Sequence, residues 1–290
     1  MVVTGANGLL GRNAIEELSK RNEIHAVVRA IPENPVVGVS YHVVDLASDW
    51  DWGVLPKQID AVFHLAQSKR MREFPEQALD IYHVNLSATA KLLDYARSAG
   101  AAHFVFASTG GLYGAGSQAF SESSPLCSPE GALKYYFDTK YCGEILAKNY
   151  ADFMSVVILR PFFIYGPDQN STMLIPRLIN SVRNWRPISI NGETGIRINP
   201  IYVSDAVIAL EAALSMLGQH TINIAGPEIV TLRHLVETIG DAMHIKPIFN
   251  FVAGEPQDVV ADISLMSQLL TVPATRVVSG VNKLVYHHDV

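Results

Sequence analysis

The chain has 290 residues, of which 49% are hydrophobic and 17% are charged, so it can bury a sizeable core and is not expected to be disordered. Its net charge of −6 argues against nucleic acid as the main partner, because binding to phosphate backbones needs a basic surface. No apolar run reaches the roughly eighteen residues of a membrane span. We therefore expect no membrane or nucleic acid partner, and one large domain with a smaller appendage.

Cysteine usage and the N-terminus bear on the compartment. Cys127 and Cys142 lack the clustered Cys and His spacing of a zinc site, so we expect no metal and no disulfide framework. No charged leader and apolar core precede the first glycines, so no export signal is predicted and a cytoplasmic location is expected.

The first half of the chain alternates short apolar runs with helical stretches, which is typical of a parallel sheet covered on both faces. The predicted strands are Met1 to Thr4, Ile24 to Arg29, Ser40 to Asp45, Ala61 to Leu65, Phe104 to Ser108 and Ser155 to Arg160. The predicted helices are Arg12 to Arg21, Asp80 to Ala99 and Lys134 to Asp152. The expected fold class is therefore α/β, with a doubly wound parallel sheet.

After Arg160 the sequence becomes rich in proline and glycine, which indicates a looser second lobe. A helix from Ser204 to Leu217 and a strand from Thr221 to Ala225 then resume the regular pattern and are expected to return to the sheet. We predict a dinucleotide-binding domain over 1–165, with 201–226 returning to it. The predicted substrate-binding lobe comprises 166–200 and 227–290.

The first predicted strand leads directly into Thr4-Gly-Ala-Asn-Gly-Leu-Leu-Gly11, which leads into a helix. Glycines in this context allow a tight turn and bring backbone N–H groups close to a pyrophosphate at the helix N-terminus. A simple tight turn is the alternative, but the position between strand and helix favours a dinucleotide. The candidate cofactor-binding residues here are Gly5, Asn7, Gly8, Leu9, Leu10 and Gly11.

The residues that follow the second and third predicted strands bear on the choice of cofactor. An acid at the end of the second strand binds a ribose 2′-hydroxyl, whereas arginine accommodates a 2′-phosphate. Arg29 stands there, which favours NADP over NAD, although it can also be a solvated strand-end arginine. Asp45 and Leu46 follow the next strand and are expected to flank the adenine, with capping of a helix as the alternative for Asp45.

Two further motifs carry chemistry. Ser108 and Thr109 stand at the carboxyl end of a predicted central strand, where ligands of open α/β sheets bind. Thr109 is the candidate to bond a substrate oxygen, and turn formation is the alternative. Tyr136 and Lys140 lie four residues apart on a predicted helix and so share one face. A cation near the phenol favours the phenolate, which predicts a lowered pKa of Tyr136 and a role in proton transfer.

Together these residues resemble the extended short-chain dehydrogenase/reductase family, the NAD(P)-dependent epimerases and dehydratases that mostly act on nucleotide sugars. The resemblance spans nearly the whole chain and implies a Rossmann-type sheet with a smaller C-terminal α/β substrate lobe. Beyond the glycine turn, its motifs are Phe63-His-Leu-Ala66, Ser108-Thr109 with Leu112-Tyr113-Gly114, Tyr136 with Lys140 and Glu144, Arg160-Pro-Phe-Phe-Ile-Tyr-Gly-Pro167 and Ile201-Tyr-Val-Ser-Asp205.

The resemblance implies a role for each matching residue. Tyr136 would be the acid/base, Lys140 would hold the nicotinamide ribose and assist Tyr136, and Thr109 would orient the reacting oxygen. The implied cofactor-lining residues are Leu65, Ala66, Gln67, Ser108, Tyr136, Lys140, Pro161, Phe162 and Ile164. The implied substrate-binding residues are Gln67, Thr109, Gly110, Phe163 and Arg197, the last resembling an arginine that binds the diphosphate. The two predicted helices Asp80 to Ala99 and Lys134 to Asp152 would pair two copies into a homodimer.

Departures from the family pattern keep several readings open. Gly110-Gly111 replaces the Asp-Glu of the dehydratases, which argues against water elimination. Phe163 replaces a common asparagine, and Gly254-Glu255-Pro256 replaces a second arginine. The first hypothesis is an epimerase or keto-sugar reductase of a nucleotide sugar. The alternatives are an NADPH-dependent reductase of a carbonyl substrate without a nucleotide, and a non-catalytic dinucleotide sensor.

Overall fold

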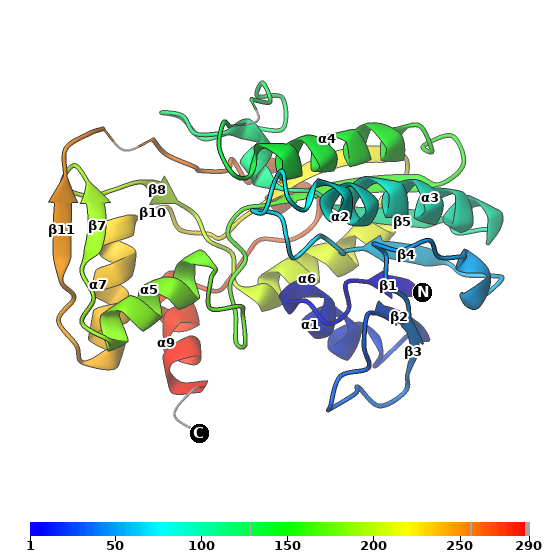
Figure 1. Ribbon diagram of the computed structural model, residues 1–290, viewed down its shortest axis with the longest axis horizontal. Coiled ribbons are helices and arrows are strands. Elements are labelled where there is room, and N and C mark those ends of the chain that lie inside the picture. The colour runs from blue at the N-terminus through cyan, green and yellow to red at the C-terminus, as the bar shows by residue number, and fades with distance from the viewer. Residues whose placement is uncertain (128, 256, 288–290) are drawn as a thin grey trace. The chain divides into compact units, whose positions relative to one another are not determined.

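A computed structural model of the chain describes residues 1–127, 129–255 and 257–287. The chain divides into two compact units, whose elements Figure 1 labels. The first contains Met1–Gly114, Pro125–Arg160 and Val207–Ile222, and the second contains Ala115–Ser124, Pro161–Ala206 and Asn223–Val290. The domain bounds predicted from the sequence stay a prediction. No helix in the described part of the chain combines the length and the apolar character that spanning a bilayer requires.

A seven-stranded sheet organises the chain, in the order β3-β2-β1-β4-β5-β6-β9. Its strands are β1 (Val2–Thr4), β2 (Ile24–Val28), β3 (Val39–Val43), β4 (Ala61–His64), β5 (His103–Ala107), β6 (Ser155–Pro161) and β9 (Gln219–Ile224). The pairs from β3 through β6 are parallel. This order confirms the predicted doubly wound sheet, and it places a topological switch between β1 and β4, where such folds bind ligands.

The predicted strands lie within one or two residues of the observed ones. Their near-continuous apolar runs are explained by burial on both faces. Val62, Phe104, Phe106 and Ile158 are fully buried and belong to one hydrophobic cluster that also contains Leu92. Burying each such side chain stabilises the fold by about 1.5–3 kcal/mol. This cluster therefore fixes the sheet beneath the loops that follow its strands.

The first helix was predicted three residues too late. α1 spans Leu9–Leu18 instead of Arg12 to Arg21, because the glycine turn itself supplies the N-cap, Gly8, and the Arg12 N–H already bonds the Gly8 carbonyl at 3.0 Å. At the other end the Asn22 side chain donates to the Leu18 carbonyl at 2.9 Å, which satisfies a carbonyl that the ended helix leaves open.

The predicted helix Asp80 to Ala99 is not uniform. It consists of α2 (Ala78–Tyr82), a π-helical turn (His83–Ser87) and α3 (Ala88–Ser98). The Thr89 hydroxyl donates to the Asn85 carbonyl at 2.6 Å, which gives that carbonyl a side-chain partner inside the turn. Turns of this kind inside helices are often found at functional sites.

Two further helices, α4 and α6, end earlier than predicted. α4 spans Lys134–Lys148 instead of continuing to Asp152, and α6 spans Val203–Ala212 before a 3₁₀ turn, Ala213–Ser215. Tightening of this kind supplies partners for the last carbonyls of a helix. Short 3₁₀ turns also span Trp52–Val54 and Gly110–Tyr113.

The second unit is a smaller α/β arrangement, as the sequence indicates. Two short sheets pair β8 (Arg197–Ile198) with β10 (Val230–Thr231), and β7 (Ile188–Asn191) with β11 (Phe249–Val252). Its helices are α5 (Leu174–Arg183), α7 (Leu232–Met243), α8 (Ser264–Leu269) and α9 (Val277–His287).

Candidate active site

The glycine turn after β1 has no room for side chains at two of its positions. Gly5 has a φ of +68°, and a Cβ there would lie 2.7 Å from the Ala66 backbone nitrogen. A Cβ on Gly11 would lie 2.2 Å from the Gly5 carbonyl oxygen, so α1 packs directly on the turn. These contacts show why glycine is required at the first and third of the three positions.

The N-terminus of α1 is suited to an anion. Its N-cap is Gly8, which has no side chain that could cap the helix, and the first turn of α1 contains no acidic residue. Leu9 and Leu10 of that turn are half-buried. The N–H groups of the first turn and the positive end of the helix dipole favour a phosphate group at such a place. A dinucleotide pyrophosphate therefore fits this turn.

The residues predicted to contact the adenosine half follow β2 and β3. The Asn7 side chain donates to the Ala30 carbonyl at 2.8 Å and so ties the turn to the segment after β2. Arg29 is exposed, and within the described residues it makes no recorded ion pair. Asp45 accepts a 3.0 Å hydrogen bond from the Ala47 N–H in a local turn, and Leu46 is buried in the core.

Tyr136 is brought together with Gln67 and Thr109. Its hydroxyl donates a 2.7 Å hydrogen bond to Oε1 of Gln67, which follows β4. The Thr109 hydroxyl caps the 3₁₀ turn by accepting from the Gly111 N–H at 3.1 Å, and it also hydrogen-bonds to the Tyr136 hydroxyl. Turn formation by Thr109 is therefore observed, and its bond to a substrate oxygen stays a prediction.

The expected lowering of the Tyr136 pKa is wrong for the protein alone. Burial raises the pKa of the phenol well above its usual value, and the hydrogen bond with Thr109 opposes this only in part. The phenol is 6% exposed, so removing it from water outweighs the attraction of a cation one helical turn away. Tyr136 is therefore held as a neutral proton donor.

Lys140 lies on the same face of α4 as Tyr136 and is 1% exposed. Its ammonium lies 4.4 Å from the centre of the Phe106 ring, a favourable cation–π contact. Burial lowers the pKa of Lys140 to about 7, against the opposing charge of Glu144. The lysine can thus change its protonation near neutral pH.

Ser108 is not directed to an open position. Its hydroxyl donates to Glu144 at 2.5 Å, and the same carboxylate accepts two bonds from Arg160. Arg160 also donates to the Tyr113 hydroxyl at 2.6 Å. This buried cluster joins the end of β5, α4 and the end of β6, and it fixes the helix that carries Tyr136.

A chain of buried polar side chains escaped the sequence prediction. The His64 ring nitrogens lie 2.7 Å from the Thr4 hydroxyl and 2.9 Å from the Thr89 hydroxyl. Asn85 donates to the Thr139 hydroxyl at 3.0 Å and accepts from the Ser68 N–H at 2.9 Å. The available signal was polar residues inside apolar runs, such as His64 after Val62 and Phe63.

This polar chain links the glycine turn to the helix of Tyr136. Burial, followed by repulsion from Lys140, lowers the pKa of His64 to about 3, so its ring is neutral at physiological pH. A neutral ring has one donor and one acceptor nitrogen, which its two threonine partners can satisfy. The Thr139 hydroxyl in turn donates to the Tyr136 carbonyl at 2.8 Å.

Of the remaining predicted residues, the half-buried Leu65 and the buried Gly110 lie in the first unit, and the others lie in the second. Pro161 and Ile164 are partly buried and Phe162 is buried. Phe163 has a φ of 46°, a left-handed conformation that is rare for an aromatic residue and that asparagine adopts more readily. Of the predicted segment at 254–256, Pro256 lies outside the described residues.

Arg197 in β8 is engaged within the second unit. Its Nε donates to Asp258 at 2.7 Å, and its backbone N–H donates to the same carboxylate at 2.8 Å. The carboxylate offsets the positive charge that was expected to bind a diphosphate.

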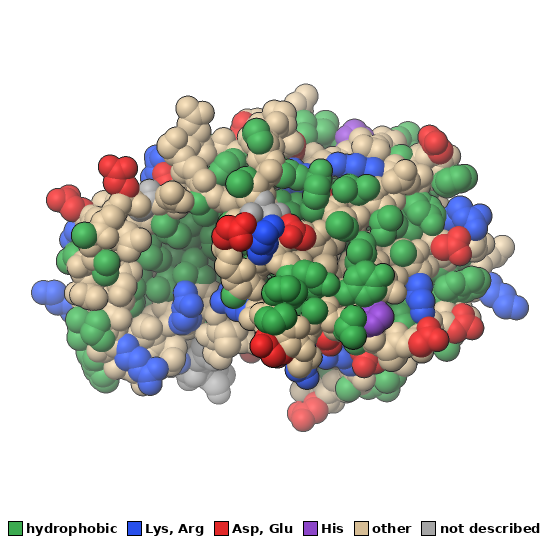
Figure 2. All heavy atoms as spheres, turned by 45° about the horizontal axis from the view of Figure 1, so that its top comes forward, with side chains coloured by type: hydrophobic (Ala, Val, Ile, Leu, Met, Phe, Trp, Pro, Cys, Tyr) green, Lys and Arg blue, Asp and Glu red, His purple; other side chains and the backbone are tan. Residues whose placement is uncertain are grey.

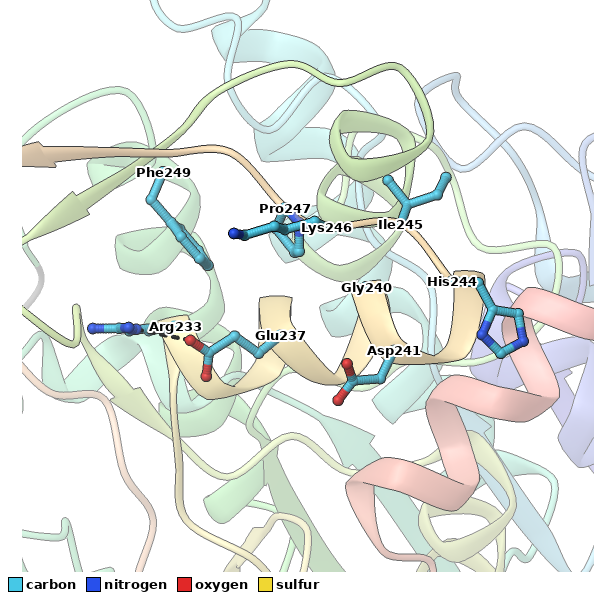
Figure 3. Close-up of a pocket in the computed structure, with 9 residues that line it drawn as sticks. All are labelled: Arg233, Glu237, Gly240, Asp241, His244, Ile245, Lys246, Pro247 and Phe249. Carbon is cyan, nitrogen blue, oxygen red and sulfur yellow. Dashed lines mark hydrogen bonds and ion pairs between the residues drawn. The ribbon is translucent and has the colours of Figure 1, made fainter.

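A separate pocket of about 520 Å³ lies along α7 in the second unit. Figure 3 shows Arg233 and Glu237 joined by their 2.8 Å ion pair on the helix, with Pro247 and Phe249 on the segment that returns past it. Its wall carries charges of both signs, and none of the predicted site residues lines it. The candidate active site is therefore the group around Tyr136.

The chain is similar to known proteins in sequence and in fold. The sequence profile described as "NAD dependent epimerase/dehydratase family" matches residues 1–225. The chain is 32% identical to the protein named "Uncharacterized UDP-glucose epimerase YtcB" of Bacillus subtilis (strain 168), over 99% of this chain and 97% of that protein. The chain belongs to the NAD-dependent epimerase/dehydratase family.

Solved structures of family members extend the likeness over the whole fold. The UDP-glucuronic acid 4-epimerase from Bacillus cereus, in complex with UDP-glucuronic acid and NAD, is 27% identical with a TM-score of 0.84, over 97% of this chain and 96% of that one. MoeE5, in complex with the same two ligands, is 28% identical with a TM-score of 0.85, over 99% and 98%. Membership of the family confirms the resemblance and the fold that the sequence predicts.

Proposed function

We propose that this protein is an NAD(P)-dependent oxidoreductase of the epimerase/dehydratase family that carries out reversible hydride transfer at a carbinol or keto carbon of a nucleotide sugar. The observation that carries the proposal is the buried Tyr136, whose hydroxyl is hydrogen-bonded to Gln67 and Thr109. The buried Lys140 lies one helical turn from Tyr136 on the same helix. The glycine turn that accommodates a pyrophosphate follows the adjacent strand β1. The names of the relatives support the same chemistry.

Each residue has a role in the proposed reaction. A nicotinamide dinucleotide, when bound, supplies or accepts the hydride. Tyr136 moves a proton to or from the substrate oxygen, and Thr109 orients that oxygen by a hydrogen bond. Lys140 holds the nicotinamide ribose and, when protonated, favours the phenolate. Leu65, Ala66 and Gln67 follow β4 beside the glycine turn and would line the dinucleotide.

The test of this proposal is loss of turnover in Tyr136→Phe. The substitution removes only the hydroxyl, so dinucleotide binding should persist while the rate falls by at least 10²-fold, the usual scale of acid–base catalysis. A non-catalytic dinucleotide sensor would instead retain its full biological activity in this variant. Equal turnover in the two proteins would overturn the assignment of Tyr136.

For the cofactor, we infer a preference for NADP. Arg29 is exposed at the end of β2 without a recorded partner among the described residues, and arginine at this place accommodates a 2′-phosphate. The solved relatives named above are complexes with NAD, so a preference for NAD is the alternative. Titration calorimetry should show tighter binding of NADPH than of NADH, with the order reversed in Arg29→Asp. Tighter binding of NADH by the unaltered protein would contradict the inference.

One observation bears on the class of reaction. A Cβ on Gly111 would lie 2.3 Å from the Phe137 ring, so the glycine pair cannot be exchanged for the Asp-Glu of dehydratases without displacing Phe137. This supports an epimerase or a reductase over a dehydratase. An epimerase recycles a retained NAD, whereas a reductase consumes free NADPH. Purified protein that carries no dinucleotide and oxidises NADPH only when a keto-sugar is present would be a reductase.

The substrate is proposed to be a nucleotide sugar, as the names of the relatives suggest. The ion pair of Arg197 with Asp258 favours the second candidate, a carbonyl compound without a diphosphate, because the carboxylate would repel one. Thermal shift with UDP-, dTDP-, GDP- and CDP-sugars separates the two. A clear increase in melting temperature with any of these supports the first, and none with any supports the second.

We also propose a homodimer formed through α4 and the helical segment that comprises α2, the π-helical turn and α3. These helices contact each other and carry the exposed apolar side chains Leu79, Tyr82, Tyr141 and Ile145. Figure 2 shows hydrophobic side chains on the face that is turned toward the reader. Such exposed apolar groups on neighbouring helices fit an interface better than free solvent. Light scattering should give twice the monomer mass, and the monomer mass in Leu79→Lys/Ile145→Lys.

A further inference from the structure

The hydrogen bond between Tyr136 and Gln67 has a defined direction. The phenol hydroxyl of Tyr136 donates, and the side-chain oxygen of Gln67 accepts at 2.7 Å. Tyr136 is buried on α4, whereas Gln67 is exposed and lies 69 positions earlier, in the segment that follows β4. An exposed side chain can move away without disturbing the core, so a ligand can take its place.

The chemistry of the acceptor determines what this contact does. A phenol that donates to a neutral carbonyl oxygen is stabilised in its protonated form, whereas a phenolate would need a donor such as an amide N–H. The amide oxygen of Gln67 is an sp² carbonyl oxygen, as is the oxygen of a ketone. Its contact with the Tyr136 hydroxyl is therefore the contact that a keto substrate would make.

We propose that Gln67 is a positioning residue that keeps the Tyr136 hydroxyl protonated and directed at an sp² oxygen, so that the resting site is prepared to reduce a carbonyl compound. This rests on the proposed hydride-transfer function and narrows it to the reductive direction. A carbonyl substrate replaces the Gln67 oxygen and accepts the same proton.

The proposed step balances in atoms and charge. The carbonyl carbon of the substrate accepts hydride from a reduced nicotinamide dinucleotide, and its oxygen takes up the Tyr136 proton as the C=O double bond becomes a single bond. The products are a secondary alcohol, the oxidised dinucleotide and a tyrosinate at position 136. The tyrosinate regains its proton from water before the next cycle.

Other charges around Tyr136 stay the same when Gln67 is replaced. On α4 the pairs are Lys134 with Asp138, at 3.2 Å, and Glu144 with Arg160. Lys140 is the buried ammonium of the same helix. On the segment after β4, Arg70 lies 3.4 Å from Glu73, and Lys69 and Arg72 are exposed. His64 is neutral, and Asp80 of α2 bonds Ser68. A comparison of Gln67 variants therefore isolates the amide.

The experiment measures the ionisation of position 136 directly. Incorporation of 3,5-difluorotyrosine at this position gives a more acidic phenol, whose ionisation is followed by fluorine-19 NMR in protein without substrate or dinucleotide. We expect the titration midpoint of Gln67→Met to lie about one pH unit below that of the protein with Gln67, the scale of one lost hydrogen bond to the neutral form. An unchanged or raised midpoint would overturn the proposal.

Two further measurements make the result specific. Gln67→Glu keeps an acceptor oxygen and adds negative charge, so its midpoint should lie above that of the unaltered side chain, and a lower one would contradict the proposal. With a carbonyl substrate, the pH above which kcat/KM for reduction falls should move down in Gln67→Met by the same amount, because kcat/KM reports the free enzyme, in which Gln67 still contacts Tyr136. The titration needs no turnover, so an absence of reductase activity would refute the proposed function while the NMR result still decides the role of Gln67.

Discussion

Glu144 on α4 accepts hydrogen bonds of 2.9 and 2.6 Å from Nε and Nη2 of Arg160 at the end of β6, with the two side chains 0% and 4% exposed. A two-point bond between a guanidinium and a carboxylate fixes both the distance and the angle between their elements. Because Glu144 lies one helical turn beyond Lys140, this buried pair sets the orientation of the helix that carries the proposed acid/base.

Removing one partner of this pair should be costly. Arg160→Met leaves the Glu144 carboxylate buried without its cation, and we expect the free energy of unfolding to fall by about 3–5 kcal/mol in urea titrations. Arg160→Met/Glu144→Gln removes the uncompensated charge and should recover part of this loss. If the two substitutions instead lower stability additively, the pair is not coupled in the way described.

Lys140 should make stability depend on pH. Burial lowers its pKa to about 7, whereas the pKa of a lysine in an unfolded chain is about 10.4. Between these values the unfolded state binds the additional proton, so stability rises with pH; below pH 7 both states are protonated and the full cost of the buried ammonium remains. Lys140→Met should therefore be the more stable protein at pH 6, with an advantage that shrinks by a few kcal/mol by pH 10. A difference that does not change with pH would exclude this account.

The first glycine of the turn can be tested against a matched control. Gly5 and Gly100 have similar positive φ values of 68° and 74°, but a Cβ on Gly5 would collide with the Ala66 backbone, whereas a Cβ on Gly100 would meet nothing within 4 Å. Gly100→Ala should cost only the roughly 1–2 kcal/mol of a left-handed backbone. Gly5→Ala should cost more and abolish dinucleotide binding in calorimetry. Equal costs and retained binding would show that the close approach to Ala66 is unimportant.

Gly111 should be sensitive to a single methyl group. A Cβ there would lie 2.3 Å from the ring of Phe137, which neighbours Tyr136, so Gly111→Ala should destabilise the protein by about 1–3 kcal/mol through overpacking. Phe137→Leu opens the space that the methyl group needs, so the double variant should lose less than the two single variants together. Thermal unfolding measures both effects, and the absence of any such rescue would argue against the contact.

The sequence predicted the sheet well because its signal is local. Apolar runs such as Phe104 to Phe106 report burial on both faces, and every predicted strand lies within one or two residues of an observed one. Helix ends were predicted less well. The start of α1 depends on Gly8 as its N-cap, and the π-helical turn at His83–Ser87 depends on Thr89 and Asn85, which a smooth helical period does not reveal.

The candidate site divides in the same way. The order of residue types in the glycine turn predicted dinucleotide binding, and the spacing of Tyr136 and Lys140 predicted proton transfer. Each motif lies within one short stretch of chain whose geometry is fixed by the local backbone. The polar chain through His64 and Asn85 was missed, since its members come from β1, β4, the π-helical turn and α4.

By itself, then, the sequence determined the parallel α/β fold, the dinucleotide turn and the residues expected to move a proton. Tertiary structure alone decided which partners those residues have: Gln67 for Tyr136, Arg160 for Glu144 and Asp258 for Arg197. It also reversed the expected pKa shift of Tyr136, because burial depends on every element packed around the phenol and not on the one lysine nearest in the chain. Contacts between residues far apart in sequence form only when the sheet brings their strand ends together.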